Sequence, residues 1–476
     1  MMMLKKGFVF GLFCVLLSAF SSAQECDIIY VTPNGSGSGT KAGPTNFLNA
    51  LTLVSPGVDH IRMAEGTYPI SNTIDLIGGV TIEGGFNPVT WIKSNNAPTL
   101  IHRNNTNVTP APDRIVAISA VGLTDFHLHD LSVLVDDAGG VGVTTYGIYI
   151  DGCSNYSLSR IRSTAGNGSS GVDGSSGVDG LFGVDGGLGQ DGNDCGDGNY
   201  AGGAGGSSWG GASAGGNGGD GGPEGRAADF WPPWAIDLGD GYPGNPGQVG
   251  SGPSPGTGGP GGPGWRNATP SPCVWLVGSC TAGANNYGQN GVDAAPPGAD
   301  GLDGVDGIPA HIGGFFVPGD GVNGDDGVHG AGGGGGGGCG SHGGALFGDN
   351  GSGPGGGGGG EGGQAGSGAT GGSGGGGSFG LYISNNGAGG VLNDCVLNSG
   401  LPGLGGIGGF PGGLGGQGGL GGWGGQGCGR GGQGGDGSAA GDGGNGGNGS
   451  PGVSQPLYEE PTGIQTIQTN LAAKLV

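Results

Sequence analysis

Acidic side chains recur at intervals of three or six residues along two glycine-rich stretches of the chain. Carboxylate oxygens are the ligands that Ca²⁺ prefers in proteins. If neighbouring stretches lie side by side, these rows could hold calcium, the one cofactor that the sequence suggests. Simple solubility is the alternative explanation, and the interval differs from the nine-residue period of calcium-binding repeats. The candidate ligands are Asp173, Asp179, Asp185, Asp300, Asp303 and Asp306.

Four of the seven tryptophans lie in two islands, residues 226–242 and 265–287, that interrupt the glycine-rich pattern. The large flat rings of tryptophan suit stacking on sugars, so these islands could bind a glycan. Rings of this size are equally typical of a small core that only holds loops together. The four residues are Trp231, Trp234, Trp265 and Trp275.

The first residues and the cysteines indicate an exported protein. Residues 1–23 have the basic start, apolar middle and small-residue end of a secretory signal peptide, and no later stretch is apolar enough to cross a membrane. We therefore expect a secreted or cell-surface protein. Removal of Cys14 with the signal peptide leaves eight of nine cysteines, an even number that favours disulfide bonds. The candidates are Cys273 with Cys280, which could close a small loop, and Cys195, Cys339 and Cys428, which lie in glycine-rich stretches.

The charge balance argues against one class of partner. The chain carries 13 Lys and Arg against 37 Asp and Glu, a formal net charge of −24. Such a charge disfavours nucleic acids and anionic membrane surfaces as partners. It is compatible with divalent cations.

Glycine recurs at every third residue along much of the chain between residues 165 and 452. A period of three fits neither an α-helix nor a β-strand, but it fits the extended polyproline-II helix. One face of that helix would be bare glycine, one apolar and one acidic, and the bare face would let another backbone approach. Neighbours are needed because this helix leaves its backbone N–H and C=O groups unpaired. The unbroken runs are 168–192, 298–307, 321–330 and 400–427.

Three structures could carry these repeats. A collagen triple helix would need far more proline than Pro402 and Pro411 supply within 400–427. A flexible linker is the simplest alternative, although a linker does not need a three-sided pattern. The third possibility resembles the polyglycine-II bundles of some phage tail-fibre adhesins and of a glycine-rich antifreeze protein, and it is the one that we expect. After Pro411 the apolar edge moves by one residue, which we interpret as a turn between two helices.

Residues 27 to about 165 read as short strands separated by Gly, Asn and Asp, with a short helix near residues 47–54 that Thr45 would cap. The order IIYVTPNGSGSGT, then PTNFLNALTLVSPGVDHIRMAEGTYPISNTIDLIGGVTIEGGF, resembles the start of a bacterial parallel β-helix of the pectate-lyase-like superfamily. The resemblance implies an all-β, right-handed parallel β-helix with a capping helix, and a β-sandwich is the alternative. The expected strands are 60–63, 73–76, 79–82, 100–102, 114–119, 126–135, 147–150 and 157–162.

An internal repeat supports the solenoid. Residues 146–150 (YGIYI) and 379–383 (FGLYI) are each followed by a further strand and then by a glycine-rich block. We therefore expect two successive coils, each with a block that leaves from the same corner. The predicted order is a signal peptide (1–23), a β-helix with its capping helix (24–165), a glycine-rich insert (166–378), a coil (379–399), a second glycine-rich segment (400–452) and a C-terminal strand or tail (453–476).

The resemblance also implies a class of activity, because β-helices of this superfamily include polysaccharide lyases and hydrolases. Asp136-Asp137 and Arg160-Ile161-Arg162 resemble two hydrolase motifs, but the Gly-His-Gly expected between them is absent. His127 and His129 share one strand face, but zinc needs more than two ligands. We assign no catalytic residue.

A structural and adhesive function fits these features best. We expect a β-helix that presents a polyglycine-II-like bundle, whose loops contact a surface glycan or another surface protein. The first alternative is a carbohydrate-active β-helix enzyme, either a lyase or a hydrolase. The second is an ice-binding protein, although faces that carry Asp, Trp and Phe suit ice poorly.

Overall fold

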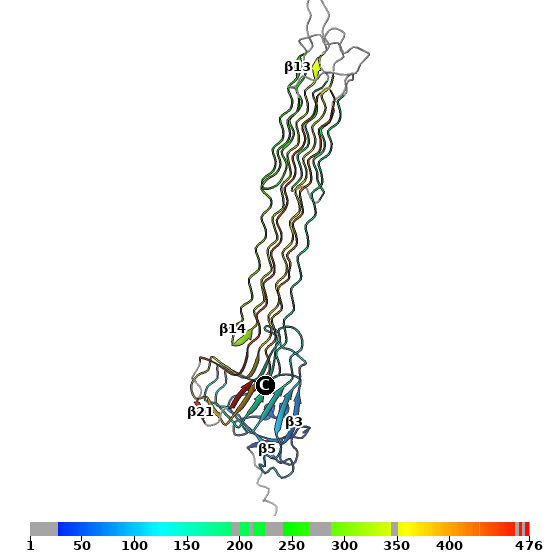
Figure 1. Cartoon of the computed structure of the whole chain (residues 1–476). Helices are drawn as coiled ribbons and strands as arrows, with labels where there is room; N and C mark the ends of the chain where they lie inside the picture. The colour runs from blue at the N-terminus through cyan, green and yellow to red at the C-terminus, as the bar shows by residue number, and fades with distance from the viewer. Residues whose placement is uncertain are drawn as a thin grey trace, which may run out of the picture.

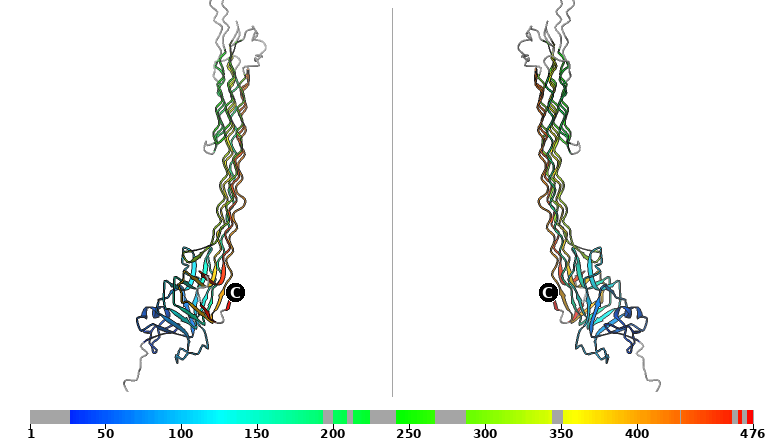
Figure 2. Two further views of the ribbon diagram at one scale, coloured as in Figure 1. Left: turned by 90° about the vertical axis from the view of Figure 1, so that its left-hand side faces the viewer. Right: turned by 90° about the vertical axis from the view of Figure 1, so that its right-hand side faces the viewer.

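The computed structural model describes residues 27–192, 200–208, 213–223, 241–266, 287–343, 351–427, 429–461, 466–468 and 472–475. A solenoid of strands lies at one end of the molecule, and a long bundle of extended segments runs away from it (Figure 1). The two side views in Figure 2 show that this bundle is a narrow rod.

Parallel strands from successive coils form three long sheets in the described ranges. Because the pairings within these sheets are parallel, the fold is a parallel β-helix. The first sheet contains β1 (Ile28–Val31), β2 (His60–Ala64), β5 (Thr81–Phe86), β8 (His127–His129), β11 (Ser157–Ser159), β18 (Val391–Asn393) and β21 (Thr466–Gln468). The second contains β4 (Ile74–Asp75), β7 (Arg114–Val121), β10 (Thr144–Asp151), β17 (Ser378–Ser384) and β20 (Ser454–Glu460). The third contains β3 (Gly66–Ile70), β6 (Thr99–Arg103), β9 (Ser132–Val135), β12 (Arg162–Thr164), β19 (Val396–Ser399) and β22 (Ala472–Leu475).

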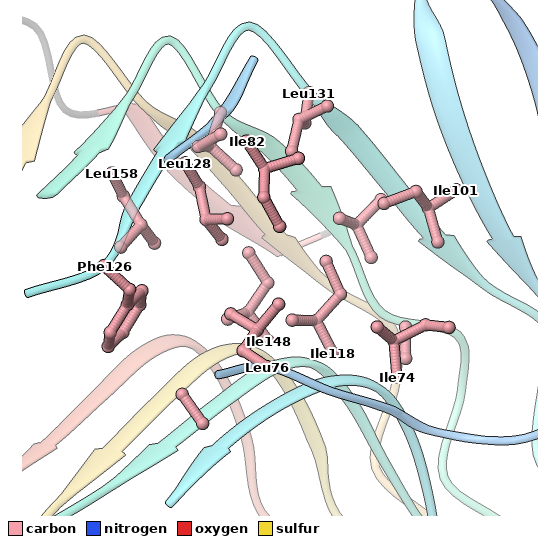
Figure 3. Close-up of a cluster of buried hydrophobic side chains, with 14 of the residues drawn as sticks. Ile74, Leu76, Ile82, Ile101, Ile118, Phe126, Leu128, Leu131, Ile148 and Leu158 are labelled. Atoms are coloured by element: carbon pink, nitrogen blue, oxygen red, sulfur yellow. The ribbon is translucent and has the colours of Figure 1, made fainter. Parts of the chain in front are cut away.

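The interior of the solenoid is a stack of aliphatic side chains. Figure 3 shows Leu128 and Leu158 of the first sheet beside Ile148 of the second. Burial of each such side chain stabilises the fold by about 1.5–3 kcal/mol, and a slip of one residue would turn all of them outward. The stack therefore fixes the register of the coils. In the first sheet, the residues in register are Ile61, Ile82, Leu128, Leu158 and Leu392, all buried.

The helix α2 (Phe47–Leu53) packs beside the first coil, as the resemblance implies, but its cap differs from the prediction. Asn46 is the N-cap, and its side chain accepts a hydrogen bond from the Asn49 N–H (2.9 Å). The prediction of Thr45 is therefore wrong: its hydroxyl accepts instead from the Asn49 side chain (2.8 Å). The helix is too short to span a membrane, and the described residues contain no longer one.

Two predicted strands are each broken at a corner of the solenoid. Residues 126–135 contain β8 and β9, and the break lies at Asp130 (φ 55°). Residues 157–162 contain β11 and the start of β12, and the break lies at Arg160 (φ 53°). A left-handed backbone turns the chain between sheets, and hydrophobic alternation gives no signal for it.

The glycine-rich residues form extended segments that reverse direction from one to the next. For example, Gly187 donates its N–H to Ala204 and Gln190 donates to Ala201, so the segments that hold them are antiparallel. These backbones bond to their neighbours instead of within themselves. In chain order the segments are 166–192, 200–208, 213–223, 241–252, 256–266, 287–308, 319–343, 351–377, 400–427 and 429–452.

Other segments enclose the segment 351–377 in the part that lies farther from the solenoid. Three consecutive residues, Gly355, Gly356 and Gly357, donate their N–H groups to three different segments, at Gln190, Gly219 and Gly432. Their carbonyl groups accept from three others, at Gly425, Gly203 and Gly336. A Cβ on Gly357 would lie 1.9 Å from the Gly422 carbonyl oxygen, so only glycine fits. The two longest stretches of consecutive glycines, 332–338 and 355–360, lie where a segment has neighbours on all sides.

Residues 400–427 form one continuous segment, so the predicted turn after Pro411 is wrong. Hydrogen bonds from the parallel segment 166–192 continue across the proline, from Gly174 to Ile407 (2.8 Å), from Gly177 to Pro411 (3.0 Å) and from Gly180 to Leu414 (2.7 Å). The acceptors Ile407 and Pro411 are four residues apart, whereas their donors Gly174 and Gly177 are three residues apart. One additional residue at this point moves the apolar edge without reversing the chain.

Candidate functional site

The segment ends farthest from the solenoid lie together at the tip of the rod, where β13 (Trp265–Arg266) pairs with β16 (His342–Gly343) (Figure 1). At the same end, Gly192 donates to Gln426 (2.8 Å) and Ser341 donates to Tyr242 (2.8 Å). The connections 193–199, 224–240, 267–286 and 344–350 therefore start and finish at the tip, although they lie outside the described residues. Of the predicted aromatic ligands, Trp265 lies in β13, whereas Trp231, Trp234 and Trp275 belong to these connections.

A pocket of about 500 Å³ lies at the tip, between the described ends of the segments 287–308, 400–427 and 429–452. The residues that line it include Tyr287, which is 44% exposed, together with Asn290, Gln426 and Arg430. The backbone around it is held by the bundle: Gly288 donates to the Arg430 carbonyl (3.1 Å), and Gln426 donates to Asp191 Oδ1 (2.7 Å). An aromatic face beside several hydrogen-bond donors is the chemistry that recognises sugars and other polyhydroxylated or anionic ligands.

None of these residues was among the predicted ligands, although the sequence contains a signal for them. Arg430 is the only Lys or Arg between residues 267 and 473. An isolated cation in a glycine run has no role in packing extended backbones, so it was a candidate for function. Tyr287 lies at the edge of the second aromatic island, but attention to tryptophan alone passed over it.

The acidic rows cap backbone groups of the rod. Asp303 Oδ1 accepts a hydrogen bond from the Asn445 N–H (2.7 Å), and Asp173 Oδ1 accepts from the Ile407 N–H (2.7 Å). At the surface these N–H groups have no further segment to bond, so a side chain of the adjacent segment takes that role. The same geometry holds for Asp179 with Leu414, Asp185 with Leu420, Asp300 with Asp442 and Asp306 with Asn448.

Calcium binding by these rows stays a prediction. Within the ranges that the structure describes, no three His, Cys, Asp or Glu side chains gather as the ligands of a metal ion. The disulfide predictions stay open as well, because Cys195, Cys273, Cys280 and Cys428 lie outside the described residues. Cys339 is buried in the bundle, and burial raises the pKa of its thiol to about 11.

An aromatic cluster joins the rod to the solenoid. The hairpin of β14 (Ala310–Ile312) and β15 (Phe315–Val317), which connects two rod segments, covers the outer face of β10 and β17. Phe316 donates its N–H to Tyr146 Oη (3.0 Å), and His311 Nδ1 lies 2.7 Å from Tyr382 Oη. Burial lowers the pKa of His311, although the charge of Glu460 opposes this shift. These contacts fix the rod relative to the solenoid.

A groove of about 640 Å³ lies on the outside of the solenoid, along β6, β9 and β12. Asp130 at its end is engaged: its two oxygens accept from Arg160 Nε and Nη2, both at 2.7 Å, and Lys93 also bonds it. Burial raises the pKa of Asp130, but the hydrogen bonds and charges of Arg160 and Lys93 outweigh burial and lower it overall. This carboxylate therefore stays ionised and is unsuited to act as a general acid.

The residues that resemble hydrolase motifs have separate partners. Asp136 lies 2.7 Å from His102, and Asp137 accepts from the Asn167 N–H (2.7 Å). Arg160 instead holds Asp130, and Arg162 lines the groove. His127 contacts Ser157 (2.8 Å) from β8. The structure thus does not bring the two motifs together.

Comparison with known proteins identifies no family for this chain. No protein-family model matches the chain, and no curated protein matches it. Among solved structures, the crystal structure of pectate lyase Pel9A is similar, with 17% sequence identity, 29% of this chain and 42% of that chain covered, and a TM-score of 0.21. The chain thus matches less than half of the length of that lyase. At this TM-score the likeness carries no argument, and the parallel β-helix rests on the strand pairings themselves.

Proposed function

We propose that the chain is an exported adhesive protein, secreted or held at the cell surface. In this proposal a right-handed parallel β-helix carries a polyglycine-II-like rod, and the tip of the rod binds a glycan or another surface partner. The observation that supports it is the pocket of Tyr287 and Arg430, which lies at the tip of the rod.

The rod has the properties of a spacer. A segment of 28 residues such as 400–427, at about 3.1 Å per residue, extends roughly 80 Å. Lateral hydrogen bonds tie it to several neighbours along that length, for example from Gly406 to Ser373 and from Gly449 to Gly406 (both 2.8 Å). A linker without such bonds would let the tip collapse onto the solenoid. The bonded rod keeps the tip at a distance.

The chemistry at the tip favours a glycan over an apolar ligand. Arg430 and the amides of Asn290 and Gln426 can donate to hydroxyl or acidic groups, and Tyr287 offers a ring face. Such a pocket is open and polar, so it suits the terminal sugar unit of a glycan that is attached to a larger surface.

The test is glycan-array binding of the purified chain, comparing wild type with Arg430→Gln and Tyr287→Ala. We expect each change to weaken binding by at least about tenfold, the loss of one charge-assisted or stacking contact. Gln417→Ala is the control, because Gln417 lies on the segment that contributes Gln426 to the pocket but does not line the pocket itself. Wild-type affinity in both tip variants, or wild-type binding to no glycan or surface partner, would contradict the proposal.

A carbohydrate-active enzyme is the second candidate, and the groove beside Arg162 is the observation in its favour. An enzyme of this kind would release reducing ends or unsaturated products from polysaccharides, and Arg162→Ala would abolish that release. The engaged state of Asp130 argues against this candidate, because a general acid needs a carboxyl group that can take up and release a proton.

A further inference from the structure

The rod exposes a straight row of apolar side chains along the segment 400–427. They recur every three residues, or about 9 Å, with one additional residue at Pro411 and with Gln417 in the position between Leu414 and Leu420, and the row extends roughly 70 Å. Each of these side chains is more than half exposed, from 56% for Leu401 to 73% for Phe410. The row consists of Leu401, Leu404, Ile407, Phe410, Leu414, Leu420 and Trp423.

The bundle itself does not require apolar residues at these positions. Its interior is glycine, and the row contributes mainly backbone groups: the Leu404 N–H is capped by Ser170 Oγ (3.3 Å) and the Leu420 N–H by Asp185 Oδ1 (2.7 Å). Any residue with a backbone N–H would serve, as Gln426 does with Asp191 (2.7 Å). Single exposed apolar side chains are ordinary, but seven of them aligned on one segment are typical of an interaction surface.

Polar groups border the row on both sides. Asp173 and Asp179 of the segment 166–192 lie along one flank, because they cap Ile407 and Leu414. Asp442 and Asn445 of the segment 429–452 lie along the other flank, where they cap Gly415 (2.7 Å) and Gly412 (3.1 Å). An apolar centre with a polar rim is the usual anatomy of a protein interface.

We propose that the row binds the same row of a second copy of the chain, so that two rods lie side by side. A matching partner must be straight, about as long, and apolar at the same interval of about 9 Å, and another copy meets all three conditions. If each of the seven side chains buried roughly 100 Å², the pair would bury about 700 Å² per partner, close to the ~800 Å² of a stable interface. The proposal is independent of what the tip binds.

The acidic rims set the salt dependence of this pairing. Facing copies bring carboxylates such as Asp173 and Asp442 near one another, and like charges repel at low ionic strength. Salt screens that repulsion and leaves apolar burial intact. Pairing therefore strengthens as salt rises, whereas an interface held by ion pairs would weaken.

The test is analytical ultracentrifugation of the full secreted chain at low and high salt. We expect a dimer whose dissociation constant rises at least about 100-fold in the triple variant Leu404→Ser, Ile407→Ser, Leu414→Ser, since each burial is worth more than about 1 kcal/mol. Leu302→Ser with Val305→Ser is the matched control, because these side chains are as exposed (75% and 68%) but lie on another segment. Hydrogen exchange that matches wild type shows that each variant is folded.

Cross-linking gives a second measurement that does not depend on weakening the pair. Leu414 lies near the middle of the row, so in either a parallel or an antiparallel pair it faces its own counterpart. Leu414→Cys should therefore cross-link with a short bis-maleimide, and Leu302→Cys should not. A wild-type chain that stays monomeric at about 100 µM and high salt would overturn the proposal. Flotation of that monomer with neutral phosphatidylcholine vesicles, lost in the triple variant, would overturn it in favour of a lipid surface.

Discussion

The rings of Tyr146 and Phe379 stack with centroids 5.3 Å apart, on strands that pair in register, although the first glycine-rich block separates them in the sequence. The block therefore leaves and re-enters the solenoid between two consecutive coils. The first block departs after β12 and the second after its paired strand β19, and Gly168 donates to Leu401 (2.9 Å) where the two blocks lie side by side. The rod thus begins at one corner of the solenoid.

Substitution in the centre of the rod should be strongly destabilising. A Cβ on Gly357 would lie 1.9 Å from a backbone carbonyl oxygen that cannot move without displacing its whole segment. We expect Gly357→Ala to lower the free energy of unfolding by about 2–3 kcal/mol, measured by calorimetry. Gly139→Ala is the matched control, because nothing lies within 4 Å of a Cβ there. Equal stability of the two variants would mean that the centre of the rod is not packed as described.

Each side-chain cap along the rod should contribute a small amount to the free energy of unfolding. In Asp303→Ala, the Asn445 N–H loses its acceptor, and we expect a loss of about 1 kcal/mol in the free energy of unfolding. Asp303→Asn keeps a carbonyl oxygen at the same place, so its stability should stay close to that of wild type. If the Asn variant were as destabilised as the Ala variant, the negative charge and not the cap would be the stabilising feature.

The presence of extended segments could be predicted from the sequence, but their arrangement could not. A period of three with one bare face predicts lateral packing, and the YGIYI and FGLYI repeat predicts adjacent coils, which the pairing of Tyr149 with Tyr382 confirms. Which segments become neighbours depends on hydrogen bonds between residues far apart, such as those from Gly359 to Gly216. Glycine-to-glycine contacts leave no side-chain pattern from which a neighbour can be identified.

Calcium should have no effect on the rod if the acidic rows act as caps. Each of the candidate carboxylates uses one oxygen to accept from a backbone N–H, as Asp306 does from Asn448 (2.7 Å). We expect isothermal titration calorimetry to detect no Ca²⁺ uptake and the unfolding temperature to be equal in calcium and in EDTA. Uptake that disappears in an Asp300→Asn, Asp303→Asn, Asp306→Asn variant would contradict this expectation and support the metal site that the sequence suggests.

Acidification should weaken the joint between rod and solenoid. The pKa of His311 is lowered by burial, so below the ordinary value near 6.5 the unfolded chain binds a proton that the folded chain resists. The stability contribution is therefore complete above that value and is lost as the pH falls through the window beneath it. We expect the drop in unfolding temperature from pH 8 to pH 5.5 to be smaller in His311→Gln than in wild type. An equal drop in the two proteins would contradict this role of His311.

The candidate site was harder to predict than the fold. The corners at Asp130 and Arg160 depend on a left-handed backbone, and the position of Arg430 beside Tyr287 depends on how two distant segments end together. Tryptophan and aspartate are the residues whose chemistry suggests sugar and metal binding. In the structure the aspartates bond backbone groups, which is a role that metal-ligand reasoning does not consider.

Amide hydrogen exchange across residues 355–360 tests the central claim most directly. Every N–H in this run donates to another segment, from Gly355 to Gln190 through to Gly360 with Gly435 (both 3.0 Å). The account predicts exchange in this run that is as slow as in the strands of the solenoid, since both would open only with the whole structure. Exchange at the rate of a free chain would show that the glycine-rich residues form a solvated linker, and the rod with its tip would have to be abandoned.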